Sequence, residues 1–148
     1  MSRIRRILHA TDFSRASRAA FDRAVEMARA NRAELLLVHV MSPVVPLGGD
    51  EYVSPKLYQE AEASARAYGQ KQLDALVAKA KKAGARATRL QLEGVPYARI
   101  AQVARSKRAD LLVIGTHGRT GLAKFFLGSV ASHVIAIAPC PVLTVRGK

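Results

Sequence analysis

Short apolar segments alternate with longer segments of helical spacing, and this alternation limits the possible folds more than any other feature of the sequence. Residues 34–40 and 110–115 are almost continuously apolar, which is typical of strands in a parallel sheet that is covered on both faces. Residues 4–10 and 141–146 form two further apolar runs, and residues 87–92 alternate between apolar and polar side chains. The alternating run fits a strand nearer the edge of the sheet.

The intervening segments carry signals for helix starts and ends. The expected helices follow Ser14, extend from Ser54 to Ala83, begin at Pro96, and extend from Ser129 to about Ala138. Ser14 is a suitable N-cap, Gly84 ends the second helix and Pro96 opens the third. Strands that alternate with helices imply right-handed crossovers. The sequence therefore predicts an α/β fold, a doubly wound parallel sheet of five strands with helices on both faces.

Length and composition predict one domain, residues 1–148, because domains most often contain roughly 100–150 residues and 49% of the side chains are hydrophobic. No apolar run approaches the ~20 residues of a membrane span, and the basic N-terminus leads into too short an apolar run for a signal peptide. Cys140 is the single cysteine, so no internal disulfide is expected. We expect a soluble, cytoplasmic protein with no membrane partner.

The chain has a formal net charge of +13, and the excess lies in its second half. Residues 1–75 carry 11 basic and 9 acidic side chains, whereas residues 76–148 carry 13 and 2. Such a surface favours nucleic acid, an anionic membrane or a phosphorylated ligand, and composition alone does not choose among them. No aromatic residue interleaves with the basic clusters at 79–82 and 105–108, which disfavours a protein that stacks single-stranded bases. We interpret these clusters as solvated helix faces.

Ligands of open α/β sheets bind beyond the carboxyl ends of the strands, where the strand order reverses. Three places in the sequence meet this condition. Thr11 and Asp12 follow the first strand, His39 and Val40 end the second, and residues 115–129 follow the fourth.

The last of these places is rich in glycine. Residues 115–121 read GTHGRTG, and Gly128-Ser129 opens the next helix, so four glycines fall within fourteen residues. Glycine permits positive φ and a close approach of backbone N–H groups to an anion, and a helix start favours phosphate. Arg119 and Lys124 add positive charge. We interpret the stretch as a phosphate-binding loop, against the alternative of a glycine-rich turn without a ligand.

Two common phosphate motifs are absent from the sequence. No string matches the P-loop, and the first strand is followed by Asp12 instead of the glycines of a dinucleotide-binding unit. A nicotinamide-dependent dehydrogenase is therefore not expected. Asp12 is a candidate ligand for a ribose hydroxyl or for a water-bound metal, and its alternative role is to help cap the first helix.

These motifs resemble those of the universal stress protein family. The spacing Gly115-x2-Gly118-x9-Gly128-Ser129 is similar to the ATP-binding signature of that family. Residues 7–14 (ILHATDFS), 36–40 (LLVHV) and 138–145 (APCPVLTV) resemble its first, second and last strands. Ala10 departs from the pattern, since many members carry proline there. The resemblance covers the chain apart from the loop at residues 41–53, which is long enough for a flap.

The resemblance implies a strand order of 3-2-1-4-5 with ATP at the switch point between strands one and four. Its site residues would be Asp12, Val40, Gly115, Gly118, Arg119, Gly128, Ser129 and Val130, and the positions of Thr11 after the first strand and of His117 in the glycine stretch add these two. Asp12 would bind ribose, the Val40 backbone would address adenine, and the glycine stretch with Arg119 would surround the phosphates, which would carry Mg or Mn. The resemblance also implies a homodimer that pairs the final strands, residues 141–146.

The remaining reactive residues give little support for catalysis. His9, His39, His117 and His133 show no metal-ligand spacing. We expect His9 and His39 to be hydrogen-bonded in strands, and only His117 to lie near phosphate. Cys140 lies between two prolines with no base beside it, so it is interpreted as a packing residue. Asp12 and His117 are the only candidate bases for hydrolysis.

Three functions follow, of which the first is favoured. It is an ATP-binding regulator of the stress-response type with at most slow hydrolysis and an unnamed protein partner. The second is a small ATP-dependent ligase or nucleotidyl transferase on a related fold, for which the chain offers little spare length. The third is a basic nucleic-acid-binding module, although no nucleic-acid motif is recognisable.

Overall fold

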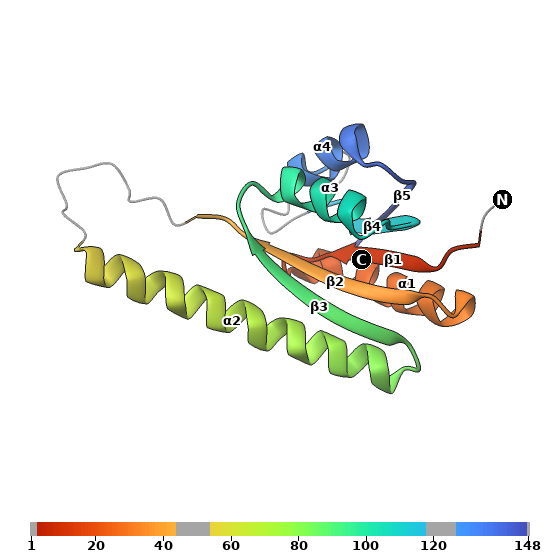
Figure 1. Ribbon diagram of the computed structural model, residues 1–148, viewed down its shortest axis with the longest axis horizontal. Helices are drawn as coiled ribbons and strands as arrows, with labels where there is room; N and C mark the ends of the chain where they lie inside the picture. Colours follow the sequence, from red (N-terminus) through yellow and green to blue (C-terminus); the bar gives the residue numbers. More distant parts are fainter. Residues whose placement is uncertain (1–2, 44–53, 118–126, 148) are drawn as a thin grey trace.

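The computed structural model describes residues 3–43, 54–117 and 127–147. Five strands alternate with four helices, in the order expected from the sequence (Figure 1). The elements are β1 (Arg6–Ala10), α1 (Arg15–Asn31), β2 (Glu34–Met41), α2 (Pro55–Lys82), β3 (Arg86–Glu93), α3 (Pro96–Ser106), β4 (Leu111–Gly115), α4 (Ser129–Ile137) and β5 (Val142–Val145).

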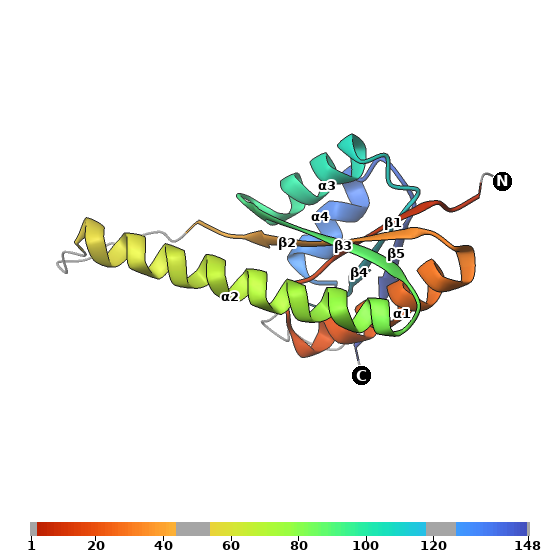
Figure 2. The same ribbon diagram turned by 60° about the horizontal axis from the view of Figure 1, so that its bottom comes forward.

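The five strands form one parallel sheet in the order β3-β2-β1-β4-β5. Helices α1 and α2 cover one face, and α3 and α4 cover the other (Figures 1 and 2). The predicted fold class and strand order are therefore confirmed. The alternating run at residues 87–92 lies in β3, at one edge of the sheet, as its pattern predicts.

Two apolar cores form because successive side chains of a strand point to opposite faces. In β1, Ile7 packs with α1 and α2, whereas Leu8 and Ala10 pack with α3 and α4. Every residue of β4 is buried, which explains why its sequence is apolar without alternation. Both cores hold the central strands firmly, so that the ends of β1 and β4 are fixed in space.

The predicted helix boundaries are confirmed at their capping residues. The Oγ atom of Ser14 accepts from the Ser17 N–H at 3.2 Å, and that of Ser54 accepts from the Leu57 N–H at 3.2 Å. Gly84 follows the end of α2 with φ +94°, a conformation that glycine adopts without strain. Pro96 is the first residue of α3.

The first turns of α2 lie outside the core. Leu57 is 58% exposed, whereas Leu73 and Ala80 further along the helix are fully buried. Figure 1 shows the reason, because the start of α2 extends beyond the sheet. Only the later turns of this 28-residue helix reach the core.

The first strand is shorter than predicted, since β1 begins at Arg6 and not at Ile4. The N–H groups of Arg5 and Arg6 donate to the Asp110 carboxylate at 2.9 and 3.0 Å, while the Arg5 carbonyl accepts from the Glu34 N–H at 2.8 Å. Within the described ranges, no helix is both long enough and apolar enough to cross a membrane.

Candidate functional site

A cleft of about 630 Å³ opens at the carboxyl ends of β1, β2 and β4. This is the position predicted from the reversal of strand order between β1 and β4. The residues that line it come from the ends of these strands, from the turn after β1, from α2, and from the first turns of α3 and α4. Its volume lies within the range of about 300–1,000 Å³ that is typical of small-molecule sites.

The turn between β1 and α1 forms one wall of the cleft. Thr11 Oγ1 accepts from the Phe13 N–H at 3.0 Å and lies 3.1 Å from the Ser17 hydroxyl. The Ser17 hydroxyl in turn donates to the Ser14 carbonyl at 2.9 Å. Phe13 has φ 64°, which is uncommon for a residue with a side chain. The hydrogen bonds of the turn hold this conformation and fix the direction of the neighbouring Asp12.

Asp12 combines the two roles that the sequence left open. Its Oδ1 accepts from the Ser14 N–H at 2.9 Å, so the carboxylate helps to order the start of α1. The same residue lines the cleft. Asp12 is the only carboxylate among the described residues of the cleft, so any ligand hydroxyl that needs a charged acceptor there must approach it.

Aromatic rings close the cleft on the side of β2. The His39 ring lies with its centroid 4.3 Å from that of Phe13, and Tyr68 of α2 meets Phe13 edge-on at 6.1 Å. Tyr68 lines the cleft although its side chain is 52% exposed. The three rings therefore tie α2 and β2 to the turn after β1.

The backbone of Val40 is directed towards the cleft. The carbonyl of Val38 accepts from the Thr11 N–H at 2.9 Å, so Val38 faces β1 across the sheet. The backbone groups of alternate residues in a strand point to the same neighbouring strand. Those of Val40 therefore also point to the β1 side, but β1 ends at Ala10, so they meet the space beyond its end. Met41 faces the other way, since its carbonyl accepts from the Gly94 N–H.

The amino terminus of α4 forms the opposite wall. Gly128 is its N-cap and supplies no side-chain acceptor, and Gly128, Ser129 and Val130 all line the cleft. The Gly128 N–H donates to the Thr116 carbonyl at 2.6 Å, which holds the helix start against the end of β4. The first N–H groups of a helix have no partner within it and carry about half a positive charge. This wall suits an anion.

Gly115 and Gly128 have extended backbone and not the positive φ expected from the sequence. Gly128 has φ −60° and ψ 156°, and Gly115 is not among the described residues with positive φ. A Cβ on Gly115 would lie 3.4 Å from the Ala16 carbonyl oxygen and 3.5 Å from Ser17 Cα, which are ordinary van der Waals distances. The expectation of positive φ is therefore wrong for these two glycines, because both have extended backbone.

Most of the predicted site residues meet at this cleft. The structure brings together Thr11, Asp12, Val40, Gly115, His117, Gly128, Ser129 and Val130. Gly118, Arg119 and Lys124, like most of the 41–53 loop, lie outside the described residues.

Several other cleft residues carry no signal in the sequence. Ala65 and Tyr68 reach the cleft from α2, and Pro96 and Ile100 reach it from α3. They lie far from the switch point in sequence, and only the packing of these helices on the sheet brings them there. A helical stripe on α2 predicts the side that faces the protein but not which turn meets the strand ends.

The histidines and the cysteine differ in environment. His9 Nδ1 lies 2.9 Å from the Val113 carbonyl, and burial lowers the pKa of His9 to about 4. His117 lines the cleft with Nδ1 2.8 Å from Thr116 Oγ1. Burial also raises the pKa of the Cys140 thiol, which makes the thiolate scarcer, as expected of a packing residue. Within the described part of the chain, no group of three or more metal-binding side chains comes together.

Comparison of the sequence with known proteins gives one family. Residues 3–146 match the family model described as the universal stress protein family. The chain is 38% identical to universal stress protein MJ0531 of Methanocaldococcus jannaschii, over 96% of this chain and 82% of that protein. It is 34% identical to universal stress protein YxiE of Bacillus subtilis, over 95% of this chain and 98% of that protein.

Solved structures of similar fold include three related proteins. Universal stress protein UspA from Lactobacillus plantarum has a TM-score of 0.84 and 26% identity, over 99% of this chain and 100% of that one. A universal stress protein in complex with cAMP has a TM-score of 0.73 and 28% identity, over 99% and 100%. An Arabidopsis thaliana family protein with AMP bound has a TM-score of 0.70 and 26% identity, over 97% and 92%.

Proposed function

Because this chain belongs to the universal stress protein family, we propose that it binds an adenine nucleotide, ATP, in the cleft at the carboxyl ends of β1, β2 and β4. The observation that carries the proposal is the amino terminus of α4, which opens into the cleft with no side chain capping it. Related structures with cAMP and AMP support an adenine nucleotide as the ligand. The order of chemical groups along the cleft supports it as well.

The cleft changes from apolar to anion-binding along its length. Near β2, the apolar side chains of Val40, Met41 and Ile100 suit a flat base, whose edge would meet the Val40 backbone. In the middle, Asp12 would accept hydrogen bonds from the ribose hydroxyls. At the far wall, the N–H groups of Ser129 and Val130 would bind phosphate oxygens.

We further propose that the bound nucleotide is held and at most slowly hydrolysed. A hydrolase needs a base that orients water. Of the two candidates, Asp12 accepts a hydrogen bond within the turn and would bind the ribose, and His117 has its Nδ1 2.8 Å from Thr116 Oγ1. A Mg or Mn ion would be carried by the phosphates and would assist their charge neutralisation. ATP then acts as a regulatory ligand in a stress response.

In the same proposal, the protein works in the cytoplasm as a homodimer that pairs β5 with its copy. β5 is the last strand at one edge of the sheet. Pro141 and Val145 direct their carbonyls to β4, where the N–H groups of Leu112 and Thr116 donate to them. By alternation, Val142 and Thr144 direct their backbone groups away from β4, which suits pairing with a second copy.

The decisive experiment is to identify the nucleotide that the purified protein retains. The protein is denatured, the released small molecules are identified by mass spectrometry, and the emptied protein is titrated with ATP, AMP and cAMP by calorimetry. We expect ATP to be released and to bind most tightly. Equal affinity for AMP and ATP would contradict the role given to the α4 wall, and no binding of any nucleotide would contradict the proposal.

A further inference from the structure

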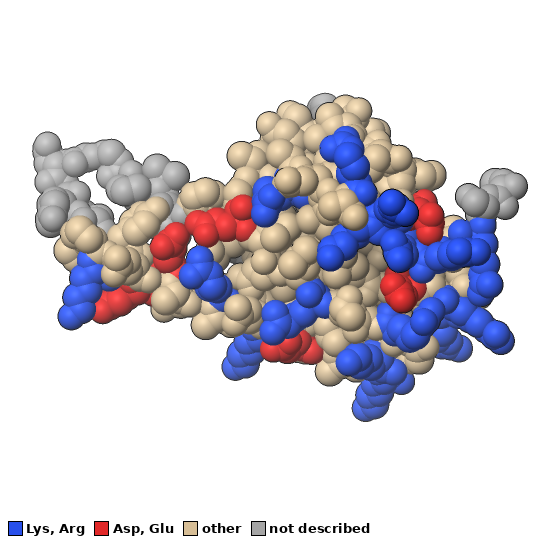
Figure 3. All heavy atoms as spheres, viewed as in Figure 1, with Lys and Arg blue, Asp and Glu red and all other residues tan. Residues whose placement is uncertain are grey.

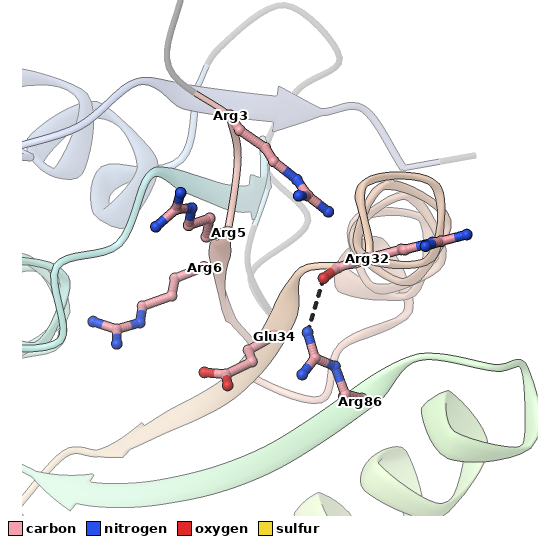
Figure 4. Close-up of a pocket in the computed structure, with 6 residues that line it drawn as sticks. All are labelled: Arg3, Arg5, Arg6, Arg32, Glu34 and Arg86. Carbon is pink, nitrogen blue, oxygen red and sulfur yellow. Dashed lines mark hydrogen bonds between the residues drawn. The ribbon is translucent and has the colours of Figure 1, made fainter.

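A second depression lies at the amino-terminal ends of the strands, opposite the cleft. It is a groove of about 320 Å³, and the described residues that line it are all charged: Arg3, Arg5, Arg6, Arg32, Glu34 and Arg86 (Figure 4). We call it the arginine groove. Arg6, Glu34 and Arg86 are the first residues of β1, β2 and β3 and are paired in register, so that they stand in one row across the sheet.

Backbone contacts fix the walls of the arginine groove. The Arg86 guanidinium donates to the Arg32 carbonyl at 2.8 Å, and that of Arg6 donates to the Lys107 carbonyl at 3.1 Å. The nearby Asp110 carboxylate accepts from the backbone N–H groups of Arg5 and Arg6. That carboxylate therefore orders the chain and forms no salt bridge with these guanidinium groups among the described residues.

The positive charge of the arginine groove lacks a matching negative charge. Five arginines line it with one carboxylate, Glu34. The salt bridges among the described residues lie elsewhere, at Arg23–Glu26, Arg66–Glu93 and Arg89–Asp74. Like charges held together destabilise the folded state by repulsion, and an anion that binds only the folded state removes this cost.

The basic surface is longer than a single phosphate group. A neighbouring depression shares Arg6 and Glu34 with the arginine groove and leads past the apolar residues Ile7, Leu8, Leu35, Leu36 and Ala109 to Ser106 and Lys107. Figure 3 shows that Lys and Arg side chains gather over this end of the molecule, near the N-terminus. An extended surface of this kind fits a polymer of phosphates better than a small ligand.

The side chains that line the arginine groove also indicate which kind of polyanion it binds. In the described part of the chain no aromatic residue lines the arginine groove, so the groove offers no surface on which single-stranded bases would stack. Membrane-surface sites combine basic with inserted apolar side chains. No apolar side chain among the described residues lines the groove, and Ile7, Leu8 and Leu35 of the neighbouring depression are buried. Arginine forms forked hydrogen bonds with phosphate oxygens. We propose that the arginine groove binds the phosphate backbone of double-stranded nucleic acid without reading its sequence.

The test compares two variants that lose the same charge at different places. The groove variant is Arg3→Gln/Arg5→Gln/Arg32→Gln, whose guanidinium groups make at most one long contact, from Arg3 to the Asn31 carbonyl at 3.5 Å. The control is Arg18→Gln/Lys56→Gln/Lys71→Gln, three exposed residues that line neither the groove nor the cleft. Both are titrated into a labelled DNA duplex of ~20 base pairs at about 50–200 mM salt.

For the wild type, the logarithm of the affinity should fall with the logarithm of the salt concentration with a slope of about −4.5 for five phosphate contacts. The groove variant should lose at least about tenfold in affinity, and its slope should shrink by about 3. The control variant should keep most of the wild-type affinity and most of the wild-type slope. Glu34→Gln should strengthen binding about two- to fivefold.

Four results would overturn the proposal. One is that the wild type does not bind the duplex at all. Another is that both triple variants lose the same affinity, which would assign binding to net charge alone. Weaker binding by Glu34→Gln would also contradict it. Binding to phosphatidylserine vesicles without binding to the duplex would assign the groove to a membrane surface instead.

Discussion

The Nδ1 atom of His39 lies 2.8 Å from the carbonyl oxygen of Thr11. A carbonyl only accepts hydrogen bonds, so Nδ1 donates, and a residue of β2 thereby holds the turn that follows β1. The Phe13 ring packs on the same imidazole with centroids 4.3 Å apart. These two contacts explain how Phe13 keeps its φ of 64° and why Asp12 has one fixed direction at the cleft.

Gly128→Asp should stabilise the fold and weaken ATP binding. A carboxylate at the N-cap accepts from the first free N–H groups of α4 and favours the helix dipole, which together should add about 0.5–1 kcal/mol to the free energy of unfolding. The same carboxylate occupies and repels the proposed phosphate site, so affinity should fall more than about tenfold. Calorimetry and thermal unfolding measure the two effects. Gly128→Asn is the uncharged control and should weaken binding less.

Asp12→Asn should weaken the binding of ATP and leave the binding of inorganic triphosphate unchanged. The amide oxygen still accepts from the Ser14 N–H, so the turn is retained, but the charge that would bind the ribose hydroxyls is lost. A charged hydrogen bond contributes about 1.5–3 kcal/mol, or roughly ten- to a hundredfold in affinity. Equal losses for ATP and triphosphate would show that Asp12 acts through the turn and not on the ribose.

His9 should make the protein less stable in mild acid. Burial lowers its pKa in the folded state to about 4, from 6.5, so the unfolded chain binds the extra proton first. The contribution of neutral His9 is complete above pH 6.5 and is lost as the pH falls towards 4. Between pH 7 and pH 5 the loss is about 2 kcal/mol.

Urea unfolding of wild type and His9→Asn at several pH values checks this prediction. The asparagine amide retains a donor for the Val113 carbonyl but does not titrate. The difference in unfolding free energy between the two proteins should therefore shrink by about 2 kcal/mol from pH 7 to pH 5. Parallel pH profiles would mean that another group causes the acid sensitivity.

Thr144→Pro should convert a dimer paired through β5 into a folded monomer. Proline removes the N–H that Thr144 directs away from β4, while the bonds of the neighbouring residues to β4 remain. Sedimentation measures the mass, and circular dichroism checks the fold. Thr144→Val, which keeps the N–H, should remain dimeric. A dimeric proline variant would place the interface elsewhere.

The sequence predicts the fold well because its local signals agree with one another. Continuous apolar runs mark β2 and β4, and Ser14, Gly84 and Pro96 mark helix ends, all as the structure has them. The switch-point rule then leads to the cleft, since it depends only on where strands end. The contribution of Tyr68 depends on how far along the sheet α2 lies, which no local pattern records.

The arginine groove is a second feature that no local sequence pattern predicts. When charged residues are counted separately in the two halves of the chain, the excess positive charge lies in residues 76–148, where residues 79–82 and 105–108 are the basic clusters. Four of the five groove arginines come instead from the nearly balanced first half, and Arg86 joins them through the pairing of β2 with β3. Charge density in space follows strand register and not sequence position.

β1 connects the two proposed sites, because it begins at the arginine groove and ends at the cleft. A strand of five residues spans about 17 Å, and the Debye length is about 8 Å at physiological ionic strength. Two bound anions at the ends of β1 would thus be screened from each other by about two Debye lengths. Duplex and ATP should therefore occupy one molecule together, each with the affinity that it has alone.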